Sequence, residues 1–318
     1  MIPDYSIPVV LILLGAGSNG KTQLLRLLGQ FIGRGNYVSI SLQDIENNSF
    51  AVANLEGKLL NMQGDLSSQW LSGLGMLKQL SGQDPITANR KYRDPIKFFN
   101  FARLVFASNK PPQLPEDTLA VWRRILPLDL PNTFQGEKDI KNYVATILTP
   151  QELSGLLNLA LDGLQQLLAK GDFSYQGSYD DRSRQYTIAS EPARVFVKER
   201  CDAGLEFKIL KEELYKDYAV FCDKNKVPLS GESQFGKDLR QVPGLSIKDK
   251  KYQKEGVRVR WWLGIKLKEE GEGEGVSPEN TPDYPPECPT CGGEEFYLTK
   301  DGRYLCSRCH PQQIDMVV

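Results

Sequence analysis

The sequence predicts an α/β fold for its first half, followed by a mostly helical domain and a small cysteine-rich module. Three observations support this prediction. A glycine-rich loop lies between an apolar run and a leucine-rich helical pattern, further apolar runs alternate with helical patterns up to residue 130, and two C-x-x-C pairs lie near the C-terminus. Strands that alternate with helices are typical of a mainly parallel sheet. A chain of 318 residues has room for about two or three domains.

The strands expected in the α/β part are short apolar runs. They comprise residues 8–14, 57–65, 101–109 and 124–130. Continuous apolar residues without strict alternation indicate strands that are buried on both faces. Leucines at helical spacing predict a helix over residues 22–32, directly after the first strand.

Residues Gly15–Thr22 fit G-x-x-x-x-G-K-[ST], the phosphate-binding loop of nucleoside triphosphatases. The strand before the loop and the helix after it favour this interpretation over a chance glycine-rich turn, because N–H groups at a helix N-terminus bind anions. We expect Lys21 to reach the terminal phosphates of ATP and the Thr22 hydroxyl to ligate magnesium. The residues expected to bind the nucleotide are Gly15, Ala16, Gly17, Ser18, Asn19, Gly20, Lys21 and Thr22.

Polar residues at the ends of the later strands are candidates for catalytic roles. Asp65 ends the second strand, and it is either a magnesium-side carboxylate or a helix N-cap. Asn109 ends the third strand, where its amide holds the attacking water or the γ-phosphate, or forms a turn before proline. Arg123 and Arg124 precede the fourth strand. They are either a solvated strand end or arginine fingers that donate charge to phosphate across a subunit boundary.

Residues 77–93 read as a helix that runs into a hairpin, with its tip at residues 89–93. Arg90, Lys91 and Tyr92 interleave cations with an aromatic ring. Cations track the phosphates of single-stranded nucleic acid and a ring stacks on a base, so these residues are candidate DNA contacts. The alternative is a solvated turn.

The second half of the chain begins with a helix signal. Thr149 and Glu152 form a capping box with proline at the first helical position, and leucines at helical spacing continue to Leu168. We expect residues 171–188 to form a loop, because they are polar and contain glycine. Cys201 and Cys222 read as buried core thiols on apolar helical faces.

Residues 189–268 predict a winged-helix-like DNA-binding domain. Helices are expected at 191–201, 210–224 and 234–241, followed by a two-stranded hairpin over 246–267. From Lys237 to Lys268 there are ten Lys/Arg and three Asp/Glu, which indicates contact with a polyanion. The residues of this region expected to contact DNA are Lys250, Lys251, Arg258 and Arg260.

An acidic linker and a zinc ribbon are expected at the C-terminus. The linker, residues 269–286, is rich in Gly, Glu and Pro and is expected to be flexible. Two C-x-x-C pairs then predict a closed site in which four thiolates hold a structural zinc ion. The zinc ligands expected are Cys288, Cys291, Cys306 and Cys309. Cys306–His310 also matches a c-type haem attachment signature, but the upstream C-x-x-C pair argues against haem.

These pieces, in this order, resemble the helicase part of phage and plasmid primase–helicases and of poxvirus replication ATPases, which belong to helicase superfamily three in the AAA+ class. The resemblance covers about residues 1–268. The matching segments are Gly15–Thr22, Ser41–Ile45, Gly57–Leu66, Leu77–Pro95, Leu104–Pro112, Trp122–Arg124, Glu152–Gly163, Phe235–Lys237 and Trp262–Ile265.

The resemblance implies a ring, usually a hexamer, that hydrolyses ATP between subunits and pulls single-stranded DNA through its centre. It implies that Lys21 and Thr22 contact nucleotide and magnesium, and that Asp65 is the second-motif carboxylate. It also implies that Asn109 is the sensor and Arg124 the finger, and places residues 90–92 on a hairpin that points into the pore.

Two departures from the family follow from the residues. The first strand is expected to begin almost at Met1, so we expect this sequence to lack the collar and the primase domain that the family carries before the ATPase. Many members of the superfamily carry two acidic residues at the second motif, whereas Gly64 precedes Asp65 here. Asp65 must therefore serve alone or borrow a partner.

The function expected is an ATP-dependent DNA helicase of a phage, plasmid or mobile-element replication system. The alternatives are an ATP-switched replication initiator or primase accessory protein without strand displacement, and a small-molecule kinase. The expected partners are single-stranded and forked DNA, further copies of the chain, and a primase or primase-polymerase on this or another chain.

No apolar run reaches the about 18 residues of a membrane span and no signal peptide is apparent, so a cytoplasmic location is expected. The expected divisions are an ATPase core at 1–148, a helical segment and loop at 149–188, the winged-helix-like domain at 189–268, the linker at 269–286 and the ribbon at 287–312.

Overall fold

The computed structural model describes residues 5–69, 71–174, 177–254, 257–268, 296–298 and 304–306. The chain divides into two compact units, Met1–Leu267 and Lys268–Val318, which are described separately. Among the described residues, no helix combines the length and apolar character that crossing a membrane requires.

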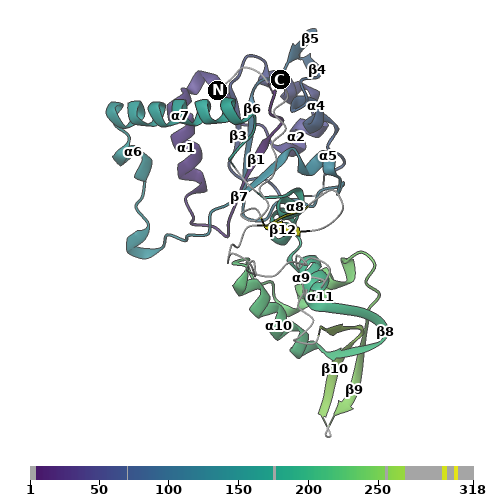
Figure 1. The fold of residues 1–318 in the computed structure, drawn as a ribbon. Coiled ribbons are helices and arrows are strands. Elements are labelled where there is room, and N and C mark those ends of the chain that lie inside the picture. Colours follow the sequence, from purple (N-terminus) through teal and green to yellow (C-terminus); the bar gives the residue numbers. More distant parts are fainter. Residues whose placement is uncertain are drawn as a thin grey trace. The chain divides into compact units, whose positions relative to one another are not determined.

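The first unit contains a parallel sheet, as the sequence predicts, with five strands where four were expected (Figure 1). Its strands are β1 (Val10–Leu14), β2 (Tyr37–Val38), β3 (Leu60–Gln63), β6 (Arg103–Ser108) and β7 (Ile125–Asp129). Their order across the sheet is β2-β3-β6-β1-β7 and every pairing is parallel. Strand β2 was not expected, because two residues carry too little pattern to predict a strand.

The two faces of the sheet have separate cores, because successive strand residues point to opposite faces. On one face, Leu13 of β1 packs with Leu25 of α1 (Lys21–Ile32). On the other face, Ile12 packs in a larger cluster with residues of several short helices. These helices are α2 (Leu42–Asn47), α3 (Ser49–Val52), α4 (Gly75–Leu80) and α5 (Leu119–Trp122), with short 3-10 turns at η1 (Arg34–Asn36) and η2 (Ala53–Leu55).

A two-stranded hairpin follows α4 and projects from the α/β part (Figure 1). It consists of β4 (Pro85–Arg90) and β5 (Arg93–Phe99), and Arg90 pairs with Arg93. Lys91 and Tyr92 therefore form the tip, and the backbone of Tyr92 is left-handed with φ 58°.

Beyond β7 the chain forms η3 (Gly136–Lys138), α6 (Tyr143–Ile147) and the long helix α7 (Pro150–Lys170). The Thr149 side chain accepts a hydrogen bond from the Glu152 N–H, and Gly171 ends the helix in a left-handed conformation. The expected helix is therefore present with its predicted N-cap. None of its residues is buried by the described parts of the chain.

The prediction of a loop over residues 171–188 is wrong for its second half, which is helix α8 (Tyr179–Ser190). A capping box between Ser178 and Asp181 begins this helix. Its apolar residues are divided between two cores. Tyr186 packs in the core of the sheet, whereas Ile188 packs in the core of the following domain. This division removes the single apolar stripe by which a helix is predicted from sequence.

The last part of the first unit has three helices and a three-stranded antiparallel sheet in the order β8-β10-β9. The elements are α9 (Pro192–Arg200), β8 (Cys201–Leu210), α10 (Lys211–Lys224), α11 (Glu232–Gln241), β9 (Lys248–Lys254) and β10 (Val257–Leu267). The three helices and the hairpin lie where the sequence predicts them, but β8 was missed. Cys201 is buried as expected and begins β8 instead of lying on a helix, and Cys222 is buried on α10.

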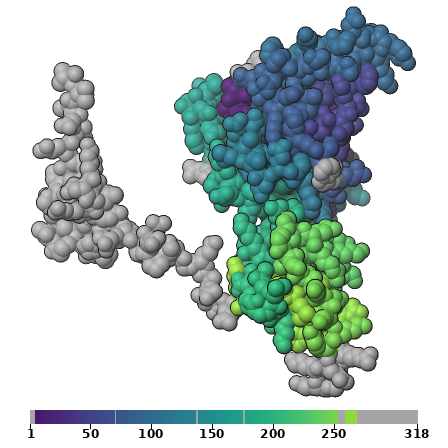
Figure 2. Space-filling view, turned by 90° about the vertical axis from the view of Figure 1, so that its right-hand side faces the viewer, coloured from purple at the N-terminus to yellow at the C-terminus, as the bar shows by residue number. Residues whose placement is uncertain are grey.

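Aromatic rings fill the core of this part. Phe196 contacts Tyr218, Phe221 and Phe235 edge-on, and the rings of Tyr218 and Phe235 stack with centroids 4.0 Å apart. In Figure 2 the N-terminal part of the first unit, coloured purple to blue, and its last part, coloured green, occupy separate regions of the visible surface.

In the second unit the described residues form one antiparallel pair, β11 (Phe296–Leu298) with β12 (Tyr304–Cys306). Of the predicted zinc ligands, only the backbone of Cys306 lies in this pair. Cys288, Cys291 and Cys309 lie outside the described residues, as does the predicted linker.

Candidate nucleotide-binding site

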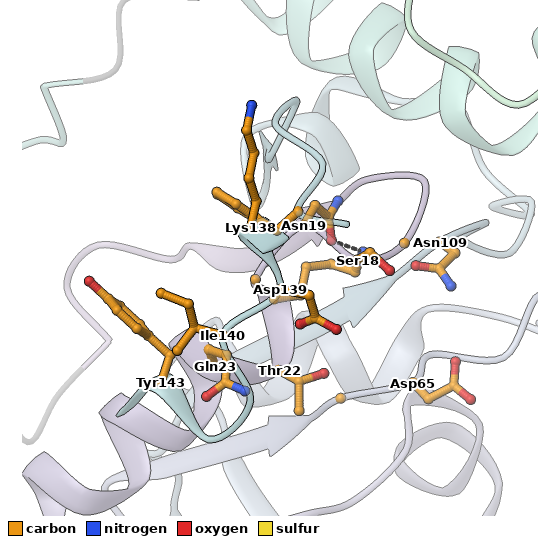
Figure 3. Close-up of a pocket in the computed structure, with 15 residues that line it drawn as sticks. Ser18, Asn19, Thr22, Gln23, Asp65, Asn109, Lys138, Asp139, Ile140 and Tyr143 are labelled. Carbon is orange, nitrogen blue, oxygen red and sulfur yellow. Dashed lines mark hydrogen bonds between the residues drawn. The ribbon is translucent and has the colours of Figure 1, made fainter. Parts of the chain in front are cut away.

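A cavity of about 800 Å³ lies where β1, β3 and β6 end, at the carboxyl edge of the sheet. Its lining residues are Gly17, Ser18, Asn19, Gly20, Lys21, Thr22, Gln23, Gly64, Asp65, Asn109, Phe134, Lys138, Asp139, Ile140 and Tyr143 (Figure 3). Open α/β sheets bind ligands at this edge. The cavity unites residues from four segments that are far apart in the sequence.

The loop between β1 and α1 depends on glycine at two positions. A Cβ on Gly15 would lie 1.6 Å from Nδ2 of Asn19 and 2.9 Å from the carbonyl oxygen of Leu130. Gly20 has φ 85° directly before α1 begins. A side chain at either position would disrupt the loop, because the first has no space and the second requires a left-handed backbone.

Lys21 is held inside the loop, with only 7% of its surface exposed. Its Nζ donates to the carbonyl oxygen of Gly15 at 2.8 Å and to Oδ1 of Asn19 at 2.7 Å. Asn19 in turn donates to the carbonyl oxygen of Leu130 at 3.0 Å, which ties the loop to the end of β7. Burial lowers the pKa of the Lys21 ammonium group. A phosphate in the cavity would stabilise its charged form.

Three oxygen-bearing side chains line one side of the cavity: Thr22, Asp65 and Asp139 (Figure 3). The alternative that Asp65 is a helix N-cap is wrong, because the next helix is α4, whose N-cap is Leu74. Asp139 was missed by sequence reasoning. Its only sequence signal is its position nine residues after Leu130, in the segment that follows a strand end. Hydroxyl and carboxylate oxygens are ligands that Mg²⁺ accepts, so the donor set fits this ion.

Asn109 also lines the cavity. It directly follows β6, which lies between β1 and β3 in the sheet. The order of the strands therefore brings the amide between the phosphate loop and Asp65. The expected polar tip of this strand is present.

An apolar wall completes the cavity and was also missed. Phe134, Ile140 and Tyr143 line it, and each has at least 44% of its surface exposed. The Phe134 N–H donates to the carbonyl oxygen of Ser18 at 2.7 Å, which fixes the wall to the loop. Exposed aromatic and aliphatic side chains beside a phosphate-binding loop offer a surface for a nucleoside.

Arg123 and Arg124 lie away from this cavity, and no arginine is among the described residues that line it. Arg124 donates from Nη1 to the carbonyl oxygen of Ala120 at 2.7 Å, while its Nε is buried with no hydrogen-bond partner among the described residues. Burial is the main cause that lowers the pKa of Arg124, Arg123 lowers it further, and Asp84 opposes the shift. Arg123 is exposed.

The candidate DNA contacts divide into two groups. At the hairpin tip, Tyr92 is fully exposed and Lys91 is exposed, whereas Arg90 forms an ion pair with Glu56. In the C-terminal sheet, Lys251 pairs with Arg260 and Lys250 pairs with Trp261. Paired residues share a face, so Lys250 and Lys251 lie on opposite faces of the sheet. The side chain of Arg258 lies outside the described residues.

Within the described residues there is no cluster of three or more His, Cys, Asp or Glu that could hold a metal ion. The predicted zinc ligands lie outside the described residues, apart from the backbone of Cys306, so the zinc site stays a prediction.

Comparison with known proteins gives one family match and a set of similar structures. Residues 13–124 match DUF5906, a family of unknown function. Among solved structures, an apo structure of the NrS-1 C-terminal region is 14% identical with a TM-score of 0.38, and the match covers 82% of this chain and 68% of that one. An A-form apo structure of the same region is 15% identical with a TM-score of 0.37, over 82% and 68% of the two chains. No match to the sequence of a curated protein was found.

Proposed function

We propose that this chain is an ATP-dependent DNA helicase with an AAA+ core, acting in replication of a phage, plasmid or mobile element. One observation carries the ATPase part of the proposal. A phosphate-loop sequence at the start of α1, the buried Lys21, and the side chains of Thr22, Asp65 and Asn109 all line one cavity. This constellation supplies the parts that phosphoryl transfer to water requires.

In this proposal each residue has a separate task. The N–H groups at the start of α1 bind the phosphates, and Lys21 exchanges its contacts with Gly15 and Asn19 for phosphate oxygens. Thr22 and Asp65 would hold Mg²⁺, which neutralises charge on the phosphates when bound. Asp139 is the second carboxylate on this side, so Asp65 has the partner that the sequence motif lacks. Asn109 orients the attacking water, and the apolar wall binds the nucleoside.

The proposal assigns Arg124 to the site of a neighbouring copy, with Arg123 beside it. Its absence from the lining of its own cavity supports an action in trans. An arginine supplied by another subunit stabilises the charge of the transferring phosphoryl group.

DNA binding is assigned first to the hairpin tip. Lys91 and Tyr92 are exposed at the tip of a two-stranded hairpin, and a cation beside a ring suits single-stranded DNA. The winged-helix-like part adds Lys250, Lys251, Arg258 and Arg260. The C-terminal module is proposed to be a zinc ribbon on a flexible tether that places the ATPase on DNA or on a primase.

The test is to measure binding of a fluorescent ATP analogue with Mg²⁺, and ATP hydrolysis with and without single-stranded DNA, using the full chain. We expect the wild type to bind ATP and to hydrolyse it faster with DNA, and we expect Lys21→Ala to lose both activities. Because the Lys21 side chain lines the cavity and does not pack in a hydrophobic core, its loss should leave the melting temperature nearly unchanged. Lys224→Ala, which changes an exposed lysine on α10, is the matched control.

Two results would change the proposal. A wild-type chain that binds no nucleotide contradicts it. ATP hydrolysis without displacement of a strand from forked DNA would instead favour an ATP-switched replication initiator.

A further inference from the structure

A second cavity, of about 330 Å³, lies between α1 and α6 and is separate from the nucleotide cavity. We call it the α1–α6 cleft. Arg26 and Gln30 of α1 line it, together with Arg34 of η1, Tyr37 of β2 and Asn142, the residue before α6. Its volume lies at the lower end of the range of small-molecule sites. The cleft therefore has room for one small ligand.

The two arginines of the cleft are exposed and unpaired. In the part of the chain that the structure describes, neither guanidinium forms an ion pair or a hydrogen bond, and no Asp or Glu lines the cleft. By contrast, the exposed Arg184 is held by Glu199 at 2.6 Å. A guanidinium group offers several N–H donors, and its planar fork matches the oxygens of a phosphate group. Arg26 and Arg34 thus suit a phosphorylated ligand.

The remaining lining residues add an aromatic ring and amide groups. A Cβ on Gly29 would lie 3.3 Å from Cε1 of Tyr37, so the ring packs directly on the backbone of α1. Gln23, Gln30 and Asn142 supply amides, which both donate and accept hydrogen bonds. The Oε1 atom of Gln23 is buried and has no hydrogen-bond partner among the described residues, so a donor that reached it would be stabilised. Rings and amides are suited to a nucleobase and to sugar hydroxyls.

We infer that the α1–α6 cleft binds a nucleoside phosphate, at a site distinct from the phosphate loop. Arg26 and Arg34 bind the phosphate group, and Tyr37 contacts the base. The inference depends on the charge and lining of the cleft, and it does not rest on the proposed ATPase function.

The cleft and the nucleotide cavity share two of their walls. Gln23 of α1 lines both. Helix α6 contacts α1, and its Tyr143 lines the nucleotide cavity whereas its Val144 lines the cleft (Figure 3). A ligand that bridges α1 and α6 would therefore hold Tyr143 at the nucleotide cavity. By linkage, each ligand then changes the affinity for the other by the same factor. This consequence alone rests on the proposed function.

The experiment measures binding of ADP and of inorganic pyrophosphate without Mg²⁺, by isothermal titration calorimetry, in the full chain with Lys21→Ala. This background removes the lysine of the phosphate loop. We expect both probes to bind, and ADP to bind more tightly, because only ADP offers a base to Tyr37. Adding Arg26→Gln with Arg34→Gln should weaken both by about tenfold or more.

The matched control is Lys216→Gln with Lys224→Gln in the same background. These two exposed lysines of α10 are also eight residues apart, and the control should bind both probes as the Lys21→Ala chain does. Because Arg26 and Arg34 are exposed, the arginine variant should have the melting temperature of the control.

Hydrogen exchange locates the ligand. ADP should slow exchange of the α6 amides in the Lys21→Ala chain, because the ligand holds α6 against α1. Arg26→Gln with Arg34→Gln should remove this protection, whereas the lysine control should keep it.

The inference is overturned if the Lys21→Ala chain binds neither probe, if the arginine variant binds both as the control does, or if ADP leaves exchange of α6 unchanged. Equal affinities for ADP and pyrophosphate would overturn the assignment to a nucleoside phosphate. An arginine variant that loses affinity only for single-stranded DNA would show that these arginines contact a nucleic-acid backbone instead. If the cleft behaves as expected but the wild type binds no ATP analogue that depends on Lys21, the proposed ATPase function fails and the cleft site stands.

Discussion

Helices α1 and α7 are both leucine-rich and amphipathic, but within the described part of the chain only α1 has buried residues. Leu25 of α1 is buried against the sheet, with Leu24, Leu28 and Ile32 packed around it. Among the residues that the structure describes, nothing buries any of the eight leucines of the longer α7. Helical periodicity therefore predicts that an apolar face exists, but it does not indicate whether the chain's own sheet or another molecule covers that face.

The largest expected effect is on ATP hydrolysis, and it concerns Arg124, which a neighbouring copy is proposed to supply. Arg124→Ala should lower the rate of ATP hydrolysis by a factor of about 10³. Mixing Arg124→Ala with Lys21→Ala should restore part of the activity, because a mixed contact pairs an intact loop with an intact arginine. Steady-state hydrolysis by mixed oligomers measures this recovery, and its absence in demonstrably mixed oligomers would count against a shared site.

The next effect compares the two helices directly. Leu25→Ala should lower the free energy of unfolding by about 2–5 kcal/mol, because it leaves a cavity in a packed core. Leu161→Ala should change it by less than about 0.5 kcal/mol, because Leu161 is 50% exposed. Denaturant unfolding of both variants measures the difference. Equal losses would show that α7 is covered by its own chain after all.

A smaller effect, on DNA binding, is expected at the tip of the β4–β5 hairpin. Tyr92→Ala should weaken binding of single-stranded DNA by about 1–3 kcal/mol if the ring stacks on a base. Lys91→Ala should weaken binding and reduce its salt dependence, because a phosphate contact releases counterions. Fluorescence anisotropy at several salt concentrations measures both effects. Unchanged affinity for both variants would show that the hairpin tip is a solvated turn that does not contact DNA.

The smallest effect concerns the start of α7. Thr149→Ala removes the hydroxyl that accepts from the Glu152 N–H and should destabilise the helix by about 1 kcal/mol. Faster hydrogen exchange should be confined to the first turns of α7, because none of its residues is buried in the described part of the chain. A cooperative loss of protection through the sheet would contradict this.

Local sequence signals predicted much of the fold. The glycine-rich loop, the apolar strands and the cap at Thr149 each depend on neighbouring residues, so their structures were predicted correctly. Prediction from the sequence failed where the structure of a segment depends on contacts with residues far away in the chain. Helix α8 divides its apolar residues between two cores, and β8 is a strand because it pairs with β10 across more than fifty residues.

The candidate site shows the same limit. Lys21 and Thr22 follow from a motif, and Asp65 and Asn109 follow from their positions at strand ends. Asp139 and Tyr143 belong to a segment without a pattern, and only the fold of the chain brings them to the cavity. Arg123 and Arg124 were selected because they are adjacent arginines, but only the fold shows that they do not line the cavity.

Helix α8 has a thermodynamic consequence. Tyr186 donates from its hydroxyl to the carbonyl oxygen of Pro112 at 2.8 Å, three residues beyond Asn109, while Ile188 is part of the aromatic-rich core. A helix shared by two cores cannot melt without exposing apolar surface in both. A ligand that binds only the folded nucleotide site should therefore also raise the melting temperature of the three-stranded sheet β8-β10-β9, although it touches no residue of that sheet.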